Sequence, residues 1–272
     1  MISAIRNLAA YRELILMLAW RNIAVQYKQA YLGIAWAVLK PLMLMLIFTI
    51  VRSFVGIDSG NIPYPILTFA ALLPWTFFQE AVTGGVVSVV GNSSLVKKIY
   101  FPREIFPITA SVGKLVELAI NFVILAGMMV YYQMAPTIYA FWVPLFILYT
   151  VVVVLAVSLA GAALNVYYRD VRSAVPVLLS LLMYVSPVMY PISLVQKKLV
   201  VDQAAGSWSD LLYKVYTVNP MTGIIDGFQR ALLHGQQPDF AVIWPGLIAT
   251  AVVLPLSYLY FKRAEGDFAD VI

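Results

Sequence analysis

The sequence predicts an all-α integral membrane protein with six transmembrane helices, an N-terminal interfacial amphipathic helix, and short outer-face helices, re-entrant or gating, between spans five and six. Hydrophobic residues make up 62% of the 272 residues, and the mean hydropathy is +0.87. Only 11% of the residues are charged, well below the roughly 25% that is typical of soluble domains. The apolar residues form continuous runs, whereas a barrel would show segments of alternating polarity, so helices are favoured.

Six apolar runs are long enough to cross a bilayer. A spanning helix needs about 20 mostly apolar residues to cross roughly 30 Å of hydrocarbon. The runs that meet this length are 34–55, 63–89, 105–132, 139–164, 174–194 and 241–261. We find no internal repeat and no low-complexity tract, so residues 1–272 are expected to form a single membrane domain.

Residues 1–33 contain too many polar interruptions to span, and they predict an interfacial helix instead. No cleavable signal peptide is indicated, because Arg21 and Asn22 interrupt the first apolar stretch and no small-residue cleavage site follows it. Residues at helical spacing form an aromatic side of this helix; they are Trp20, Ala24, Tyr27 and Tyr31. This pattern favours a helix whose ring edges lie at headgroup level. A cytosolic helix packed on the protein itself is the alternative.

The outer loop at 195–240 carries signals for a short helix in its second half. Asn219 suits the N-cap, Pro220 the first helical position, and Gly235 the residue after the end. Between them runs one apolar stripe, which consists of Met221, Ile224, Ile225, Phe228 and Leu232. A helix of about 13 residues would be roughly 20 Å long, too short to cross. It is expected to lie on the outer face or dip into it, either as a re-entrant or gating element or as a plain packed helix.

The distribution of basic residues predicts the orientation, because cytoplasmic flanks carry excess Lys and Arg. One side would hold Arg6, Arg12, Arg21, Lys28, Lys97, Lys98, Arg103, Arg169, Arg172, Lys262 and Arg263. The other side would hold Arg52, Lys197, Lys198, Lys214 and Arg230. Both termini, including the tail at 262–272, are therefore expected to be cytoplasmic, and so is the loop at 94–107.

Motifs for chemistry within the chain are scarce. No stretch fits G-x-x-x-x-G-K-[ST], so the chain is not expected to bind ATP with such a loop. There is no cysteine, and the single histidine, His234, has no second histidine with which to form a metal site. We therefore predict no catalytic residue, no metal site and no cofactor in this chain.

A few charged residues fall inside the predicted spans, where each needs a partner or water. Lys114 and Glu117 share a helix face at i, i+3, so an ion pair explains both. Lys40 and Glu80 either pair within the bundle or line a water-filled path.

Several stretches together resemble the transmembrane subunits of ATP-binding-cassette exporters for lipid-linked polysaccharides, including O-antigen, capsule and teichoic-acid permeases. The matching stretches are WRNIAVQYKQAYLGIAWAVLKP at 20–41, SLVKKIYFPREIFP at 94–107, NVYYRDVR at 165–172, SPVMYP at 186–191, NPMTGIIDGF at 219–228 and YFKRAEGDFADVI at 260–272. They follow the family order along nearly the whole chain. Asn22 and Gln26 stand where the family often has an acidic residue and an arginine, and the arginine of the outer-helix motif is displaced to Arg230.

The resemblance implies a half-transporter in the bacterial inner membrane. It implies a homodimer with the channel between the two copies, and two copies of a separate cytosolic ATPase that holds ATP and Mg. It also implies a glycan substrate on a polyprenyl pyrophosphate, contact with membrane lipids and no nucleic acid. The first and fifth spans would line the channel with Trp36, Lys40, Tyr184 and Tyr190.

Three further groups of residues are candidates for roles in export. The anionic pyrophosphate needs cations at the cytoplasmic entrance, and Lys97, Lys98 and Arg103 are available there, unless they serve only as positive-inside anchors. Coupling to the ATPase is expected of Tyr100, Phe101, Pro102, Arg169 and Asp170. The outer gate is expected to include Asn219, Pro220, Phe228 and Arg230.

Two rival functions remain at this point. The same architecture could export a drug or a small lipid. A membrane-embedded enzyme acting on lipid-linked sugars is disfavoured, because the loop acids are scattered and Asp170 lies between Arg169 and Arg172, which suits an ion-paired contact better than a general base.

Overall fold

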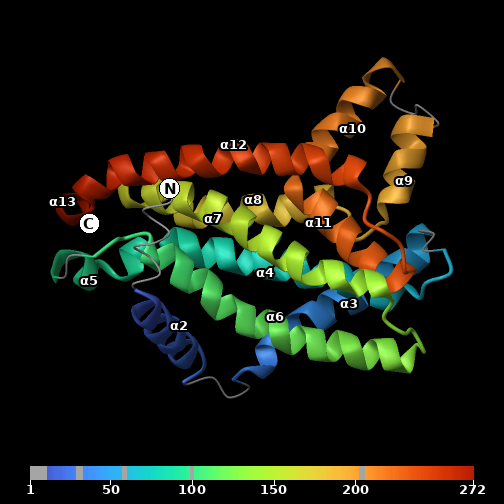
Figure 1. Cartoon of the computed structure of the whole chain (residues 1–272), viewed down its shortest axis with the longest axis horizontal. Helices are drawn as coiled ribbons and strands as arrows, with labels where there is room; N and C mark the ends of the chain where they lie inside the picture. Colours follow the sequence, from blue (N-terminus) through green and yellow to red (C-terminus); the bar gives the residue numbers. More distant parts are fainter. Residues whose placement is uncertain (1–10, 29–32, 57–59, 99–100, 202–205) are drawn as a thin grey trace.

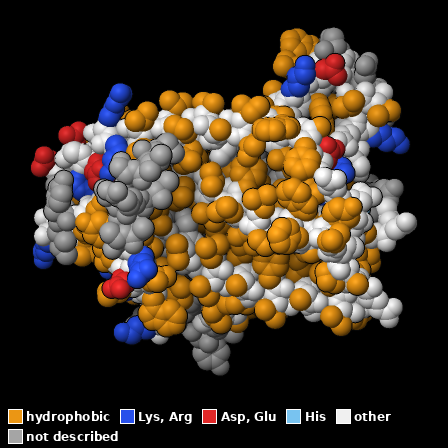
Figure 2. Space-filling model, in the orientation of Figure 1, with side chains coloured by type: hydrophobic (Ala, Val, Ile, Leu, Met, Phe, Trp, Pro, Cys, Tyr) orange, Lys and Arg blue, Asp and Glu red, His pale blue; other side chains and the backbone are white. Residues whose placement is uncertain are grey.

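The computed structural model describes residues 11–28, 33–56, 60–98, 101–201 and 206–272 (Figure 1). The described residues form helices and connecting turns, without a strand among them. Helices α9 and α10 project at one end of the molecule, while α5 and α13 lie at the opposite end with the C-terminus. The hydrophobic side chains on the face shown in Figure 2 form a broad band between two ends that carry most of the charged side chains.

Within the part of the chain that the structure describes, five helices are long and apolar enough to cross a membrane. They are α3 (Ala35–Val55), α4 (Tyr64–Gly91), α6 (Ile105–Tyr131), α7 (Val143–Tyr167), which continues the 3-10 turn η1 (Ile138–Trp142), and α12 (Phe240–Ala264), which is followed by the 3-10 turn η5 (Glu265–Asp267). These helices agree with five of the predicted spans. The count of six stays a prediction.

The prediction that one helix covers 174–194 is wrong. Helix α8 (Val171–Val185) has 15 residues, which corresponds to roughly 22 Å and falls short of a typical span. It ends because Ser186 is extended, with ψ of 156°, as expected for a residue that precedes a proline, here Pro187. Pro191 then precedes a separate short helix, α9 (Ile192–Gln196), and the π turn η2 (Lys197–Val201).

Helix α4 forms the centre of the molecule. It packs against α3, α6, α7 and α8, and also against the outer helix α11. Trp75 and Phe69 on α4 are completely buried. A helix that is apolar on all sides is stable where neighbours cover every face, which explains its central position.

The N-terminal helix α2 (Arg12–Tyr27) packs on α6. Leu18 and Ala19 are buried in this contact region, whereas the side chain of Trp20 is 72% exposed. Helix α2 therefore both packs on the protein and presents an aromatic side chain outwards. Tyr31, the last residue of the predicted aromatic stripe, lies outside the described residues, and the interfacial position stays a prediction.

The outer segment contains η3 (Gly206–Trp208), α10 (Ser209–Val218), α11 (Pro220–Gln229) and the π turn η4 (Arg230–His234). Helix α11 starts at the predicted residue, and the Asn219 side chain accepts a hydrogen bond from the backbone N–H of Met221 at 3.1 Å. The segment stops at Gly235, whose φ of 58° is left-handed. All residues from 221 to 229 are buried, so α11 dips into the protein.

Candidate functional site

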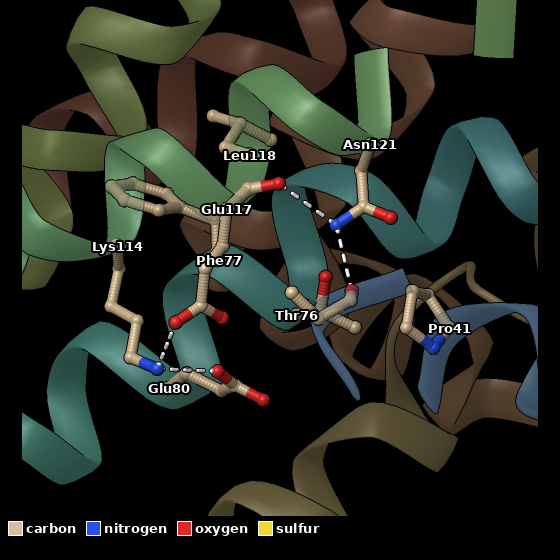
Figure 3. Close-up of a pocket in the computed structure, with 9 residues that line it drawn as sticks. Pro41, Thr76, Phe77, Glu80, Lys114, Glu117, Leu118 and Asn121 are labelled. Atoms are coloured by element: carbon tan, nitrogen blue, oxygen red, sulfur yellow. Dashed lines mark hydrogen bonds and ion pairs between the residues drawn. The ribbon is translucent and has the colours of Figure 1, made fainter. Parts of the chain in front are cut away.

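Four charged side chains meet between α3, α4 and α6, and Figure 3 shows three of them. Lys40 Nζ lies 2.6 Å from Glu80 Oε1. Lys114 Nζ lies 2.9 Å from Glu80 Oε2 and 2.6 Å from Glu117 Oε1. The predicted Lys114–Glu117 ion pair is confirmed, and Lys40 and Glu80 are paired within the bundle. Two cations and two anions alternate, so the cluster has no net charge.

Asn121 adds a polar contact beside this cluster. Its Nδ2 donates to the Ala37 carbonyl of α3 at 3.0 Å and to the Glu117 carbonyl at 2.9 Å (Figure 3). A buried amide that bonds a backbone carbonyl of another helix holds the two helices at a fixed register. Asn121 and the ion pairs together fix α3 against α4 and α6.

A groove of about 460 Å³ opens at the exposed end of the cluster. Its lining combines the charged groups with apolar residues of α3; the lining residues are Trp36, Ala37, Lys40, Met43, Leu44, Ile47, Glu80 and Glu117. The Lys40 side chain is 54% exposed and is the most accessible member of the cluster. Two of the predicted channel residues, Trp36 and Lys40, therefore share one groove.

The other two predicted channel residues lie elsewhere. The Tyr190 hydroxyl donates to the carbonyls of Tyr184 and Val185 at 3.1 and 3.2 Å, while the Tyr184 side chain is 55% exposed. These tyrosines belong to the end of α8 and the turn after it, and neither lines the groove on α3. Within one copy, the four residues form two separate pairs.

The predicted headgroup residues differ in their surroundings. Lys97 and Lys98 are exposed at the end of α5 (Ser93–Lys98). Arg103 is engaged with the C-terminal segment: its backbone N–H donates to Glu265 Oε1 at 2.9 Å, and its guanidinium donates to the Glu265 carbonyl. Lys97 and Lys98 are thus accessible to an anion, whereas Arg103 links the start of α6 to the C-terminal segment at Glu265.

A C-terminal clamp, defined by Glu104, Lys262 and Glu265, joins the start of α6 to the end of α12. Lys262 Nζ lies 2.7 Å from both Glu104 Oε2 and Glu265 Oε2. Glu104 is only 4% exposed, and such a buried carboxylate requires a cation. The clamp also brings α13 (Phe268–Val271) against this end, where the Arg103 guanidinium lies 5.9 Å from the centre of the Phe268 ring.

The predicted coupling residues gather at the same end, with one exception. Tyr100 lies outside the described residues. Phe101 is 9% exposed and packs on Phe106, with ring centres 5.3 Å apart, and Pro102 beside it is half-buried. Arg169 and Asp170 are exposed in the turn between α7 and α8. The hydroxyl of Tyr167, just before this turn, donates to Asp267 at 3.1 Å and so places the turn near the C-terminus.

The predicted outer-gate residues lie together on and beside α11; Phe228 is buried, and the other three are half-buried. Asn219 Nδ2 donates to Ser186 Oγ at 2.9 Å, which links the start of α11 to the break after α8. Phe228 is fully buried, and its ring centre lies 6.0 Å from that of Phe146. Pro220, the first residue of α11, is half-buried and packs close to α12.

Arg230 is held by two acids in this outer region. Its Nε lies 2.8 Å from Asp226 Oδ2, and its Nη2 lies 3.6 Å from Asp239. Burial raises the pKa of Asp226 to about 6, although Arg230 acts in the opposite direction. His234 follows in η4 and is exposed, and its Nδ1 lies 3.1 Å from the Gln229 carbonyl.

Comparison with known proteins identifies a family whose model matches most of the chain. Residues 13–233 match the family described as ABC-2 type transporter. The chain belongs to the ABC-2 type transporter family. The match covers the chain from α2 to η4, and it confirms that the sequence resembles the permease subunits of such transporters.

Relatives within the ABC-2 family align along most of their length. The O-antigen export system permease protein RfbA of Myxococcus xanthus is 28% identical over 273 residues and is covered completely, as is this chain. A protein of the same name from Klebsiella pneumoniae is 24% identical, over 98% of this chain and 97% of its own length. The polysialic acid transport protein KpsM of Escherichia coli is 21% identical over 79% of both chains.

Sequence reasoning missed the contacts that join distant parts of the chain. Arg103 and Glu265 are 162 positions apart, and no periodicity connects them. The contact between Glu80 and Lys114 was also missed, although pairing of Lys40 with Glu80 was one of the two expected outcomes. Charge balance was an available signal, since an acid inside a span requires a cation from a neighbouring helix.

Proposed function

We propose that this chain is the permease half of an ATP-driven exporter that moves a polysaccharide, carried on a polyprenyl pyrophosphate, from the cytoplasm across the bacterial inner membrane. Two copies would form the path, and two copies of a separate ATPase would drive transport. The observation that carries the proposal is the end-to-end similarity to an O-antigen export permease, which leaves no part of either chain unmatched. Both termini would be cytoplasmic.

The charged end formed by α5, the turn at 168–170 and the C-terminal clamp supports a docking role for the ATPase. Lys98 and Asp170 are exposed there, whereas the nearby Phe101 is buried. Exposed charges of both signs can steer a second protein to this end and fix its orientation by electrostatic complementarity. Because the chain has no cysteine, single cysteines can be placed cleanly. Cysteines at Arg169 and Asp170 are expected to cross-link to the ATPase, and one at Phe101 is not.

Lys97 and Lys98 would capture the pyrophosphate of the substrate at this end. Two adjacent, exposed ammonium groups can both donate to one dianionic group, and such charge-assisted hydrogen bonds are the stronger ones. Arg103 is expected to contribute indirectly, because its guanidinium already donates to the Glu265 carbonyl. The chain offers a matched control at the opposite end, since Lys197 and Lys198 are also adjacent and exposed.

The test is deletion of the gene and its complementation. The deletion strain is expected to lose surface polymer and to accumulate lipid-linked polymer on the cytoplasmic side. Wild type and Lys197→Ala/Lys198→Ala should restore export, while Lys97→Ala/Lys98→Ala should restore it only in part. Unchanged surface polymer with accumulation of a drug or a small lipid would identify the rival transport function. Turnover of a lipid-linked sugar by the purified chain without any ATPase would identify an enzyme.

A further inference from the structure

We propose that Lys40 binds the phosphate of the transported lipid within the membrane, and that Glu80 is an internal competitor that keeps this binding weak. The inference rests on the proposed function, because it names the chemical group that the path must handle. It places a second phosphate contact in the groove on α3, away from the exposed lysines of α5.

In the charged cluster, positive and negative side chains alternate in a row, and one end of the row is exposed. The exposure of the four side chains falls along the row from 54% for Lys40 to 22% for Glu80, 16% for Lys114 and 11% for Glu117. Among the described residues, Glu80 pairs with two lysines and Lys114 with two carboxylates, whereas Lys40 pairs with one carboxylate. Lys40 is therefore the terminal cation and the one that a ligand can reach.

The ammonium of Lys40 has capacity for another acceptor. An ammonium group carries three hydrogen-bond donors. Among the described residues, Lys40 Nζ donates to Glu80 Oε1 at 2.6 Å. The Lys40 side chain also lines the groove of about 460 Å³ and is 54% exposed. Phosphate oxygens accept strong hydrogen bonds from such a cation.

The rest of the groove suits a hydrocarbon chain attached to that phosphate. Met43, Leu44 and Ile47 follow Lys40 at i+3, i+4 and i+7 and therefore lie on the same face of α3. They line the groove beyond the lysine, and Met43 and Ile47 are 57% and 51% exposed. A cation at one end of an apolar strip complements an amphiphile whose head is an anion and whose tail is a hydrocarbon chain.

The pairing of Glu80 makes an exchange of partners possible. If a phosphate takes Lys40, Glu80 still has Lys114 at 2.9 Å, so no carboxylate is left without a cation. An unpaired buried charge would be strongly unfavourable. The charge of Glu80 nevertheless repels the incoming anion and competes for the same ammonium. The resulting weak binding suits transport, because a substrate that is bound too tightly cannot leave the site.

The test measures the binding of a fluorescent polyprenyl phosphate to the permease, purified with its ATPase into phosphatidylcholine nanodiscs without ATP. Lys40→Gln is expected to weaken binding by about tenfold, because one charge-assisted hydrogen bond is lost. Glu80→Gln is expected to strengthen binding by roughly three- to tenfold, because a like charge and a competitor are removed. Lys214→Gln, which changes an exposed lysine on α10, should leave binding unchanged.

The opposite signs of the two variants separate a binding role from a structural one. A folded Glu80→Gln that binds polyprenyl phosphate no better than wild type would overturn the proposal. An equal effect of Lys40→Gln on the binding of polyprenol, which lacks the phosphate, would also overturn it. Full competition by phosphatidylglycerol would overturn it too, because the site would then bind bulk lipid. If Glu80→Gln does not fold, Glu80→Asp, with a shorter side chain, should also strengthen binding.

The outcome is independent of the export assay. Unchanged surface polymer in the deletion strain, with Lys40-dependent binding retained, would overturn the proposed function alone. Export of polymer with binding that does not depend on Lys40 would overturn this inference alone.

Discussion

Replacing Gly246 by alanine is expected to loosen the contact between α12 and the outer helix α11. A Cβ atom at position 246 would lie 2.7 Å from Pro220 Cα and 3.2 Å from Pro220 N. The contact is reciprocal, because a Cβ atom at Gly223 on α11 would lie 2.9 Å from Ile243 Cα on α12. In both cases the obstacle is backbone, so rotation of a side chain cannot relieve it and the helices must separate.

The magnitude follows from two opposing effects. Overpacking costs about 1 to 3 kcal/mol, and a backbone obstacle places Gly246→Ala near the upper end. Alanine favours the helix by about 1 kcal/mol over glycine, which offsets part of the strain. The net loss is about 2 kcal/mol, which corresponds to a fall of roughly 4 to 8 °C in melting temperature for a chain of this size.

Gly127→Ala in α6 is the matched control, because a Cβ atom there would meet nothing within 4 Å. It is expected to leave the protein as stable as wild type, or slightly more stable, since only the helix propensity changes. Both variants can be measured by thermal unfolding of the purified protein in detergent. Equal melting temperatures for Gly246→Ala and Gly127→Ala would refute the close packing of α11 on α12.

Three further perturbations test other contacts. Lys262→Met leaves the buried carboxylate of Glu104 without this cation, a loss of about 3 kcal/mol, so a cysteine placed at the buried Ala264 should be labelled faster. Asn219→Ala removes the cap of α11 and should lower stability by about 1 kcal/mol in thermal unfolding. Because burial raises the pKa of Asp226 to about 6 from 3.8, its contribution to stability is complete below about pH 4 and is lost as the pH rises through about 6. The melting temperature of wild type should therefore fall across this window relative to that of Asp226→Asn.

Each of these perturbations has its own comparison. Arg263→Met changes the exposed neighbour of Lys262 and should leave labelling at Ala264 unchanged; equal rates for the two variants would argue against the clamp. Asn219→Asp keeps a capping oxygen and should be more stable than Asn219→Ala. An unchanged pH dependence in Asp226→Asn would show that another group titrates in that window.

The long helices were predictable because crossing a membrane imposes a length and a composition. Helix α4 illustrates this, since its 28 residues contain no charge apart from Glu80. The same criterion failed at 174–194, where apolar residues continue past Ser186 although the helix does not. The composition of this stretch did not indicate the end of the helix. Pro187 and Pro191 did, because proline restricts the backbone conformation however apolar the surrounding residues are.

The candidate site was predictable only where it is local. The Lys114–Glu117 pair follows from a spacing of three residues within one helix. Pairing of Lys40 with Glu80 was one of two expected outcomes, because a charge inside a span needs a partner or water. The position of Glu80 between Lys40 and Lys114 depends on how α3, α4 and α6 pack, and hydrophobic periodicity within each helix does not fix that packing. Helix α11 is intermediate: Asn219 and the proline after it set its start, while its burial depends on α4, α7 and α12.

Helix α6 connects the two polar clusters of the molecule. Its first turn follows Glu104, which the C-terminal clamp ties to Lys262 on α12. Glu117 and Asn121, 13 and 17 residues further along, lie roughly 20 to 26 Å away at 1.5 Å per residue. There Asn121 bonds the Ala37 carbonyl, and the ion pairs reach Lys40 on α3. Because a continuous helix is stiff along its axis, a displacement of the loop before Glu104 would be carried to α3 through α6. The loop proposed to meet the ATPase and the groove proposed to bind phosphate are therefore attached to one rigid element.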